Sequence, residues 1–190
     1  MGSSEAAASV TPLSVEKTAI EGLWLIQMKS VSDGRGTIRE FYRRSSFVEA
    51  GLPSLGEWLQ INVTESNRGV IRGLHGEDMD KLVAVVEGEA FGAYVDTRPA
   101  SSTFGQVVTA HLTKGRQVLV PRGVCNGFQS ISDAPSQYLY AFNAEWVAGM
   151  AGTSLSPLSP VLAIEWPIPL TSDDVPARVS AKDFQAPQSP

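Results

Sequence analysis

The feature that most constrains the fold is a succession of short, strand-like segments separated by glycine and proline turns. From Leu55 onward they recur about every ten residues, as in QVVTAHLT, RQVLVP, GFQSIS and QYLYAF. β-Branched and aromatic residues are common in them, and such residues fit strands better than helices. Short strands at regular spacing are typical of a β-sandwich or barrel. The sequence therefore predicts an all-β fold built as a β-sandwich with a few short helices.

The segments that flank this region have other signals. Residues 22–31 (GLWLIQMKSV) predict a strand, DGRG at 33–36 a turn, and TIREFYRR a second strand. SSFVEAGL at 45–52 begins with serines that can cap a helix, and it ends near a glycine and a proline. LVAVVEGEAFGAYVD at 82–96 predicts a β-hairpin that turns at Glu87 and Gly88. The chain is rich in proline and loops after Trp146.

Length and composition exclude several classes of protein. The 190 residues fit one domain, which we expect over residues 17–187, with flexible tails at 1–16 and 188–190. A net charge of −5 argues against a nucleic-acid partner. No apolar run approaches the length of a membrane span, and MGSSEAAASVTP lacks the apolar core of a signal peptide. The single cysteine, Cys125, suits a reducing compartment, so we expect a cytoplasmic protein without a membrane association.

A basic run lies inside the stretch from Gln60 to Leu82. It begins with alternating polar and apolar residues and then brings together Arg72, His75 and Lys81, and His75 is one of only two histidines. Cationic or basic groups on neighbouring strand positions can form a pocket for an anion or a developing oxyanion. The alternative interpretation is a hairpin with solvated surface charges.

Six blocks occur in a fixed order along the chain. They are DGRGTIRE (33–40), the run from Gln60 to Lys81 with RGVIRGLH at its centre, VDTRPASSTFG (95–105), QYLYAFNAEW (137–146), IEWP (164–167) and VSAKDFQAP (179–187). Together they resemble the dTDP-4-dehydrorhamnose 3,5-epimerase family, whose members are nucleotide-sugar epimerases. The resemblance spans roughly residues 18–187 and implies a cupin jelly roll.

Epimerisation beside a carbonyl needs a base on one face of the carbon, an acid on the other, and positive charge or donors where the enolate oxygen forms. The resemblance implies that His75 is the base, that Asp183 orients it, and that Tyr140 is the acid. Tyr138 is the competing acid, because it lies two residues earlier on the same strand face. Lys81 would stabilise the enolate.

The same resemblance implies a set of substrate-binding residues. Arg72 would support the enolate or hold the substrate, and Gln60 and Asn62 share a strand face that points into the pocket. Arg35, with Glu40, stands where the family contacts the nucleotide.

The family forms homodimers in which an N-terminal strand crosses to the partner. The strand around Trp24 is the candidate for this exchange. The expected partners are therefore a nucleotide-sugar substrate and a second copy of the chain.

The histidine count argues against a cupin metal site, which usually needs about three histidines and a carboxylate. Only His75 and His111 are present, and the alternating segment around His111 predicts that its side chain faces solvent. We therefore expect no metal and no cofactor.

Four positions depart from the family pattern. Asn126 replaces a usual histidine, Gly92 an acidic residue, and Ile38 an aromatic that often stacks on thymine, while the GEDMD loop after His75 is short. Trp146 offers another platform for a base. These departures leave open the nucleotide, the sugar and the number of inverted centres.

The predicted activity is that of an isomerase. We expect inversion of C3 and/or C5 of a nucleotide-linked 4-keto-6-deoxyhexose, with dTDP-4-dehydro-6-deoxy-D-glucose as the first candidate. The alternatives are a 3-only or GDP-sugar epimerase, a 3,4-ketoisomerase, and a non-catalytic cupin that binds sugar nucleotides.

Overall fold

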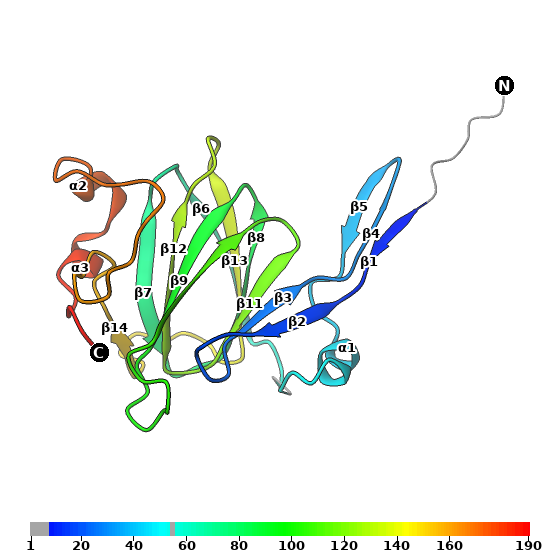
Figure 1. Cartoon of the computed structure of the whole chain (residues 1–190), viewed down its shortest axis with the longest axis horizontal. Coiled ribbons are helices and arrows are strands. Elements are labelled where there is room, and N and C mark those ends of the chain that lie inside the picture. The colour runs from blue at the N-terminus through cyan, green and yellow to red at the C-terminus, as the bar shows by residue number, and fades with distance from the viewer. Residues whose placement is uncertain (1–7, 54–55) are drawn as a thin grey trace.

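A computed structural model describes residues 8–53 and 56–190, and most of its strands form two facing sheets (Figure 1). The larger sheet has, in spatial order, β2 (Ser14–Lys17), β3 (Trp24–Gln27), β11 (Arg116–Val120), β8 (Lys81–Glu87), β13 (Ser136–Phe142) and β6 (Gln60–Ser66). The other has β10 (Val107–Leu112), β9 (Ala90–Asp96), β12 (Val124–Ser130), β7 (Ile71–Glu77) and β14 (Gly152–Ser154). Neighbouring strands are antiparallel, which confirms the predicted all-β sandwich.

A third, smaller sheet projects from the sandwich as an arm (Figure 1). Its strands are β1 (Ser9–Thr11), β4 (Ser30–Asp33) and β5 (Gly36–Arg39), in the order β1-β4-β5. The β4–β5 turn falls within the predicted DGRG segment. Trp24, in the strand expected to cross to a partner, pairs with Leu119 of its own chain.

The expected N-terminal tail is also partly wrong. Residues 1–7 lie outside the described part of the chain, but β1 and the first three residues of β2 fall within the predicted tail of residues 1–16. Val10 pairs with Val31 and Val15 pairs with Ile26. Strands of three or four residues are too short to show a period in the sequence, so pairing with distant neighbours determines them. At the other end, Ser159 donates a hydrogen bond to the carbonyl of Gln188, which ties the predicted C-terminal tail to the domain.

The predicted hairpin at Glu87 and Gly88 is wrong as well. β8 pairs with β11 and β13, whereas β9 pairs with β10 and β12, so the connection crosses from one sheet to the other. Gly88 has φ +76°, and a Cβ there would lie 2.5 Å from the Ser132 hydroxyl. The glycine therefore marks a tight turn, as predicted, but strand partners far along the chain decide which strands pair.

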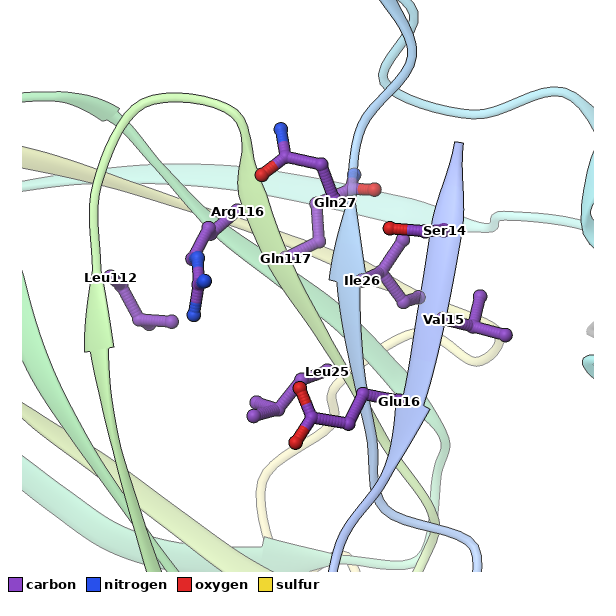
Figure 2. A pocket seen from close by; sticks show the side chains of 9 residues that line it. All are labelled: Ser14, Val15, Glu16, Leu25, Ile26, Gln27, Leu112, Arg116 and Gln117. Carbon is purple, nitrogen blue, oxygen red and sulfur yellow. The ribbon is translucent and has the colours of Figure 1, made fainter. Parts of the chain in front are cut away.

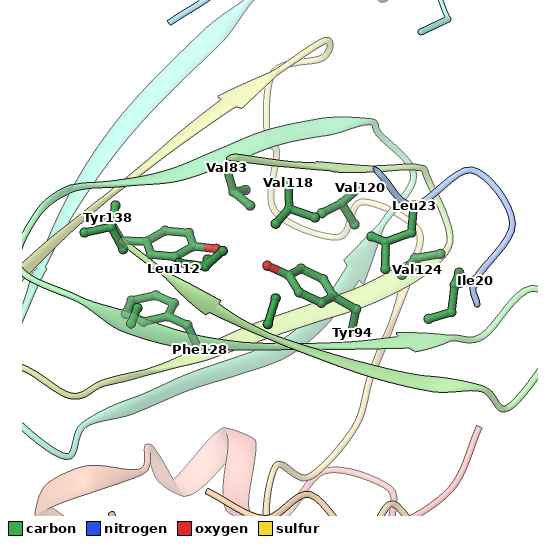
Figure 3. Close-up of a cluster of buried hydrophobic side chains, with 13 residues drawn as sticks. Ile20, Leu23, Val83, Tyr94, Leu112, Val118, Val120, Val124, Phe128 and Tyr138 are labelled. Atoms are coloured by element: carbon green, nitrogen blue, oxygen red, sulfur yellow. The ribbon is translucent and has the colours of Figure 1, made fainter. Parts of the chain in front are cut away.

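Apolar residues from both sheets form the central core (Figure 3). Its largest fully buried side chains include Tyr94, Phe128 and Tyr138, and the Tyr138 ring stacks on Phe128 at 4.1 Å between centroids. Burying one such side chain stabilises a fold by ~1.5–3 kcal/mol. This core holds the two sheets at a fixed separation, and so it also positions side chains that face the space between them.

Two further apolar clusters cover the outer faces of the sandwich. Helix α1 (Arg44–Glu49) places Phe47 against the six-stranded sheet. Its N-cap is Arg43, with no side-chain cap, so the predicted serine cap is wrong although the helix is present. On the other sheet, Leu155 and Leu162 of the C-terminal region pack on β7, β9 and β12.

A hollow of about 260 Å³ lies beside β2, β3 and β11, where Glu16, Gln27 and Arg116 are among its lining residues (Figure 2). Each of the lining residues lies away from the basic run of the sequence. In the described part of the chain, no helix is long and apolar enough to cross a membrane.

Candidate active site

A cavity of about 400 Å³ collects most of the predicted site residues, and we call it the main cavity. Its predicted members are Asn62, Arg72, His75, Lys81, Asn126, Tyr140, Trp146 and Asp183. It is also lined by Thr64, Gly73, Glu77, Phe142, Ser180 and Lys182. The basic run is therefore part of a pocket and not a solvated hairpin.

A bulge in β7 explains why Arg72 and His75 face the same cavity although three positions separate them. Asn126 pairs with His75 and Phe128 with Arg72, so β7 has one more residue than β12 in this interval. Gly73 has φ +102°, and a Cβ there would lie 2.6 Å from the Asn126 carbonyl oxygen. Bulges of this kind redirect side chains beside active sites. Glycine is required here because no other residue fits both the backbone angle and the space.

His75 and Asp183 form a hydrogen-bonded pair in the cavity wall. His75 Nε2 lies 2.6 Å from Asp183 Oδ1. Asp183 belongs to the short helix α3 (Ala181–Phe184), which contacts β7, and its backbone N–H donates to the side chain of Ser180, the N-cap residue. The cap fixes the start of the helix, and this directs Asp183 toward β7.

The charge of Asp183 bears on which nitrogen of the His75 ring carries a proton. Burial raises the pKa of Asp183, but the hydrogen bond to His75 and the hydrogen bonds from Ser180 and the Gly73 backbone lower it by more, so the side chain is a carboxylate at neutral pH. A carboxylate accepts a hydrogen bond from Nε2–H, and in a neutral imidazole with that tautomer Nδ1 carries no proton. In that form Nδ1 of His75 can accept a proton.

Lys81 lies at the bottom of the cavity and is only 3% exposed. Its ammonium donates to Glu77 Oε2, to Asn126 Oδ1 at 2.7 Å and to the His75 carbonyl at 3.0 Å. Burial lowers the pKa of Lys81, while Glu77 opposes this. Burial raises the pKa of Glu77, but Lys81 lowers it by more. The result is a buried ion pair beside the base.

Tyr140 lines the same cavity as His75 but comes from the other sheet. It lies on β13, pairs with Asn62 of β6, and packs between Tyr138 and Phe142 along one strand face. Burial raises the pKa of Tyr140, so its phenol keeps its proton at neutral pH and can donate it. The main cavity is thus lined by an imidazole from one sheet and a phenol from the other.

Tyr138 does not share this position. Its ring is fully buried in the central core, and its hydroxyl points toward that of Tyr94 (Figure 3). Neither hydroxyl has a hydrogen-bond partner in the described part of the chain. Of the two candidates for the acid, only Tyr140 is among the residues that line the main cavity.

Arg72 and Gln60, both predicted to bind substrate, differ in whether they line the main cavity. Arg72 is fixed by hydrogen bonds from Nε to the Ser66 hydroxyl at 2.8 Å and from Nη2 to the Glu65 carbonyl at 3.1 Å. Gln60 does not line the cavity. Its Oε1 accepts a hydrogen bond from the backbone N–H of Trp146 at 2.7 Å, which holds the loop that carries the Trp146 side chain at the rim of the cavity.

Arg35 and Glu40, which the resemblance places at the nucleotide, do not line the main cavity of their own chain. Arg35 pairs with Asp33 at 2.6 Å in the projecting arm, and Glu40 pairs with Arg43. Backbone pairing of β4 with β5 holds the Arg35 turn at the end of the arm, away from the sandwich. Their own chain therefore cannot bring them to His75 without moving the arm.

Six lining residues were not predicted as site residues, and three of them are charged or aromatic: Glu77, Phe142 and Lys182. Glu77 is two residues after His75 on the same strand, and this spacing in the sequence indicates that both side chains lie on one face of the sheet. Phe142 has the same relation to Tyr140. Lys182 is next to Asp183, but only the turn of α3 brings it to the rim, and no period in the sequence encodes that.

The described residues contain no group of three or more histidine, cysteine, aspartate or glutamate side chains that could hold a metal ion. His111 is exposed, as predicted, and lies 2.7 Å from Glu89 on the surface.

Comparisons with known proteins agree in pointing to one family. A family model described as dTDP-4-dehydrorhamnose 3,5-epimerase matches residues 17–189. A dTDP-4-dehydrorhamnose 3,5-epimerase of Shigella flexneri is 34% identical over 169 residues, which cover 85% of this chain and 92% of that protein. A dTDP-4-dehydrorhamnose 3-epimerase of Streptomyces niveus is 35% identical over 155 residues, or 78% of this chain and 73% of that protein.

A solved structure is similar over almost its full length. The Legionella pneumophila dTDP-6-deoxy-D-glucose-3,5-epimerase, in complex with dTDP-4-keto-L-rhamnose, superposes with a TM-score of 0.81 at 32% identity. The match covers 93% of this chain and 92% of that one.

Proposed function

This chain belongs to the dTDP-4-dehydrorhamnose 3,5-epimerase family, and from that we propose that it inverts C3, C5 or both in a nucleotide-linked 4-keto-6-deoxyhexose. It is an isomerase of the epimerase class on a cupin-type β-fold. The first candidate substrate is dTDP-4-dehydro-6-deoxy-D-glucose. The observation that carries the proposal is that the His75–Asp183 pair and Tyr140 come from different elements and line one cavity.

The first step is removal of a proton from the carbon beside the C4 carbonyl. Nδ1 of His75 takes this proton, while Asp183 holds the opposite side of the ring and stabilises the imidazolium that forms. The bonding electrons move to the C4 oxygen, which gives an enolate. The 2.6 Å contact between His75 and Asp183 supports these roles, because it fixes the ring orientation before substrate binds.

The enolate oxygen needs donors that are already in place. The Lys81 ammonium lies in the cavity wall, and it binds Asn126 through the amide oxygen, which leaves the amide NH₂ of Asn126 free to donate. Such fixed donors stabilise developing charge without reorganising. Arg72 adds a positive charge that suits the diphosphate of the substrate. These contacts support roles for all three residues in binding and charge stabilisation.

Inversion is completed from the opposite face of the carbon. Tyr140 lies on β13, in the sheet that faces β7, and its phenol delivers a proton to the planar carbon on the side away from His75. Proton return from the His75 side would regenerate the starting sugar. Two residues on different sheets therefore account for inversion, whereas one residue would give only exchange.

Proton NMR in D₂O tests this function. Wild-type protein with dTDP-4-dehydro-6-deoxy-D-glucose should incorporate deuterium at C3, C5 or both and form the inverted sugar. The labelled position distinguishes a 3-only epimerase from a 3,5-epimerase. A 3,4-ketoisomerase would give a 3-keto product, and a binding protein would give neither product nor exchange. The GDP-linked sugar in a parallel sample tests the nucleotide.

We also propose that the chain acts as a homodimer in which each arm reaches the partner's cavity. β6 is an edge strand whose Ile61 and Val63 are 60% and 57% exposed, and Ile38 of the arm is 77% exposed. Apolar side chains on an unpaired strand favour association with another strand. This arrangement would bring Arg35 to the cavity of the partner subunit, whereas Arg35 does not reach the cavity of its own chain.

Mixed dimers test this assembly. Arg35→Ala and His75→Ala proteins are each expected to be defective alone. When subunits are exchanged, one of the two sites of a mixed dimer would combine an intact His75 with an intact Arg35 from the other subunit. Activity recovered on mixing supports the proposed assembly, and a monomer mass by light scattering at micromolar concentration contradicts it.

A further inference from the structure

A second cavity of about 460 Å³ also has His75 in its lining, and we call it the rear cavity. It shares His75, Glu77, Trp146 and Lys182 with the main cavity. The two cavities therefore meet at the base, and a ligand whose reacting carbon lies at His75 can extend into both.

The charges decide which end of the substrate lies in which cavity. The main cavity alone contains Arg72 and Lys81, whereas all residues that line only the rear cavity are uncharged. A diphosphate is best placed beside a guanidinium. The nucleotide end of the substrate therefore belongs in the main cavity, and the part of the sugar remote from the nucleotide faces the rear cavity.

The chemistry of a 4-keto sugar identifies that remote part. The nucleotide is attached at C1, and C4 lies across the ring from it. The substituent on C5 is next to C4, so it points away from the nucleotide. In a 6-deoxyhexose this substituent is a methyl group, which is about as large as one water molecule of ~30 Å³. The rear cavity has room for a much larger group.

The floor of the rear cavity is built from small residues of β14. Ser154 pairs with His75 in antiparallel register, so the two side chains lie on the same face of the sheet. A Cβ at Gly152 would lie 2.7 Å from the Gly76 carbonyl oxygen, so this position has no space for a side chain. The Ser154 hydroxyl, with Val147 and Met150 among the other lining residues, gives a surface of mixed polarity.

We propose that the rear cavity is a subsite for the C5 substituent of the sugar, and that the enzyme accepts 4-keto sugars in which this substituent is a hydroxyalkyl chain longer than methyl. This inference rests on the proposed epimerase function. A short chain with one hydroxyl matches both the volume and the mixed lining.

Two substrates test the subsite. One is dTDP-4-dehydro-6-deoxy-D-glucose, with a C5 methyl group, and the other is the dTDP-linked 4-keto-6-deoxyheptose, with a C5 hydroxyethyl group. Deuterium incorporation gives kcat/KM for each. We expect wild-type kcat/KM for the heptose to be within about tenfold of that for the hexose, or above it.

Ser154→Phe fills the rear cavity beside His75. It should lower kcat/KM for the heptose at least tenfold more than for the hexose, a difference of about 1.4 kcal/mol. Val161→Phe, at a site that is 66% exposed and outside both cavities, adds the same ring as a control and should leave both values unchanged. If circular dichroism shows that Ser154→Phe is unfolded, Met150→Trp fills the cavity from the loop side with the same expected result.

The outcomes separate the subsite from the activity. Wild-type protein that exchanges deuterium into the hexose but not into the heptose would overturn the subsite and leave the epimerase function intact. An equal loss for both sugars in a folded cavity-filling variant would overturn it too. Absence of exchange with either sugar would overturn the proposed function and the subsite together.

Discussion

His75 Nε2 and Asp183 Oδ1 lie 2.6 Å apart although 108 residues separate them in the chain. The pair joins β7 to the C-terminal segment. It therefore links the sandwich, which carries His75, to the short helix α3, which carries Asp183.

Asp183→Asn keeps the shape of the side chain and removes its charge. The imidazolium would lose its partner, and the amide can hold the wrong tautomer of His75. We expect kcat to fall by about 10²-fold, the lower end of what a positioned acid or base contributes. Asp173→Asn, an exposed carboxylate in the same region, is the matched control and should retain activity. Similar kcat values for the two variants would exclude a role for Asp183 in orienting the base.

Gly73→Ala tests the β7 bulge. The new Cβ would lie 2.6 Å from the Asn126 carbonyl oxygen at φ +102°, so we expect a loss of about 2–3 kcal/mol in the free energy of unfolding. Gly34→Ala is the control, because nothing lies within 4 Å of its Cβ, and it should change stability by less than about 0.5 kcal/mol. Urea denaturation measures both. Equal stability of the two variants would show that the bulge tolerates a side chain.

Glu77→Gln leaves the Lys81 ammonium buried without its carboxylate. Removing one partner of a fully buried pair costs about 3–5 kcal/mol, and Glu77 is partly exposed, so we expect about 2–3 kcal/mol. The double variant Glu77→Gln/Lys81→Met removes both charges and should recover most of this stability. Chemical denaturation of the two single variants and the double variant gives the coupling. A double variant that is as unstable as the sum of the singles would contradict a paired charge.

The fully buried Asp96 predicts a pH dependence of stability. Burial raises the pKa of Asp96, but hydrogen bonds from Arg98, Ser101 and Thr103 lower it by more, well below its usual range. Because the pKa of Asp96 is lower in the folded chain than in the unfolded chain, its carboxylate stabilises the fold fully above the unfolded pKa of about 3.9. This stabilisation is lost as the pH falls from there through the folded pKa. Asp96→Asn should therefore cost about 2–3 kcal/mol at pH 7, and the difference from wild type should shrink below about pH 4. A difference that stays constant from pH 7 to pH 3 would contradict the shift.

The sequence predicted the type of fold better than it predicted which segments come together. Alternation and turn residues identified the strands, but the partners of β8 and β9 depend on contacts across the whole sandwich, so the predicted hairpin was wrong. The joint placement of Arg72 and His75 depends on the bulge at Gly73, which a regular two-residue period does not contain. The family motifs, not local periodicity, linked His75 to Asp183.

The residues of the arm show a second limit of prediction from sequence. Arg35 and Glu40 were expected at the site from the motif alone, and the chain places them away from its own cavity. A motif carries no information on which copy of the chain supplies a residue. Glu77, by contrast, was recoverable from its spacing to His75.

Deuterium exchange and inversion, measured together for His75→Ala and Tyr140→Phe in D₂O, test the central claim most directly. His75→Ala should lose both, because no enolate forms. Tyr140→Phe keeps the ring and removes the donor, so exchange through His75 should persist while inversion falls by about 10²–10⁴-fold. The ratio of exchange to inversion should therefore rise only in Tyr140→Phe. Inversion at the wild-type rate in Tyr140→Phe, or enzymatic exchange in His75→Ala, would contradict a two-residue mechanism across this cavity.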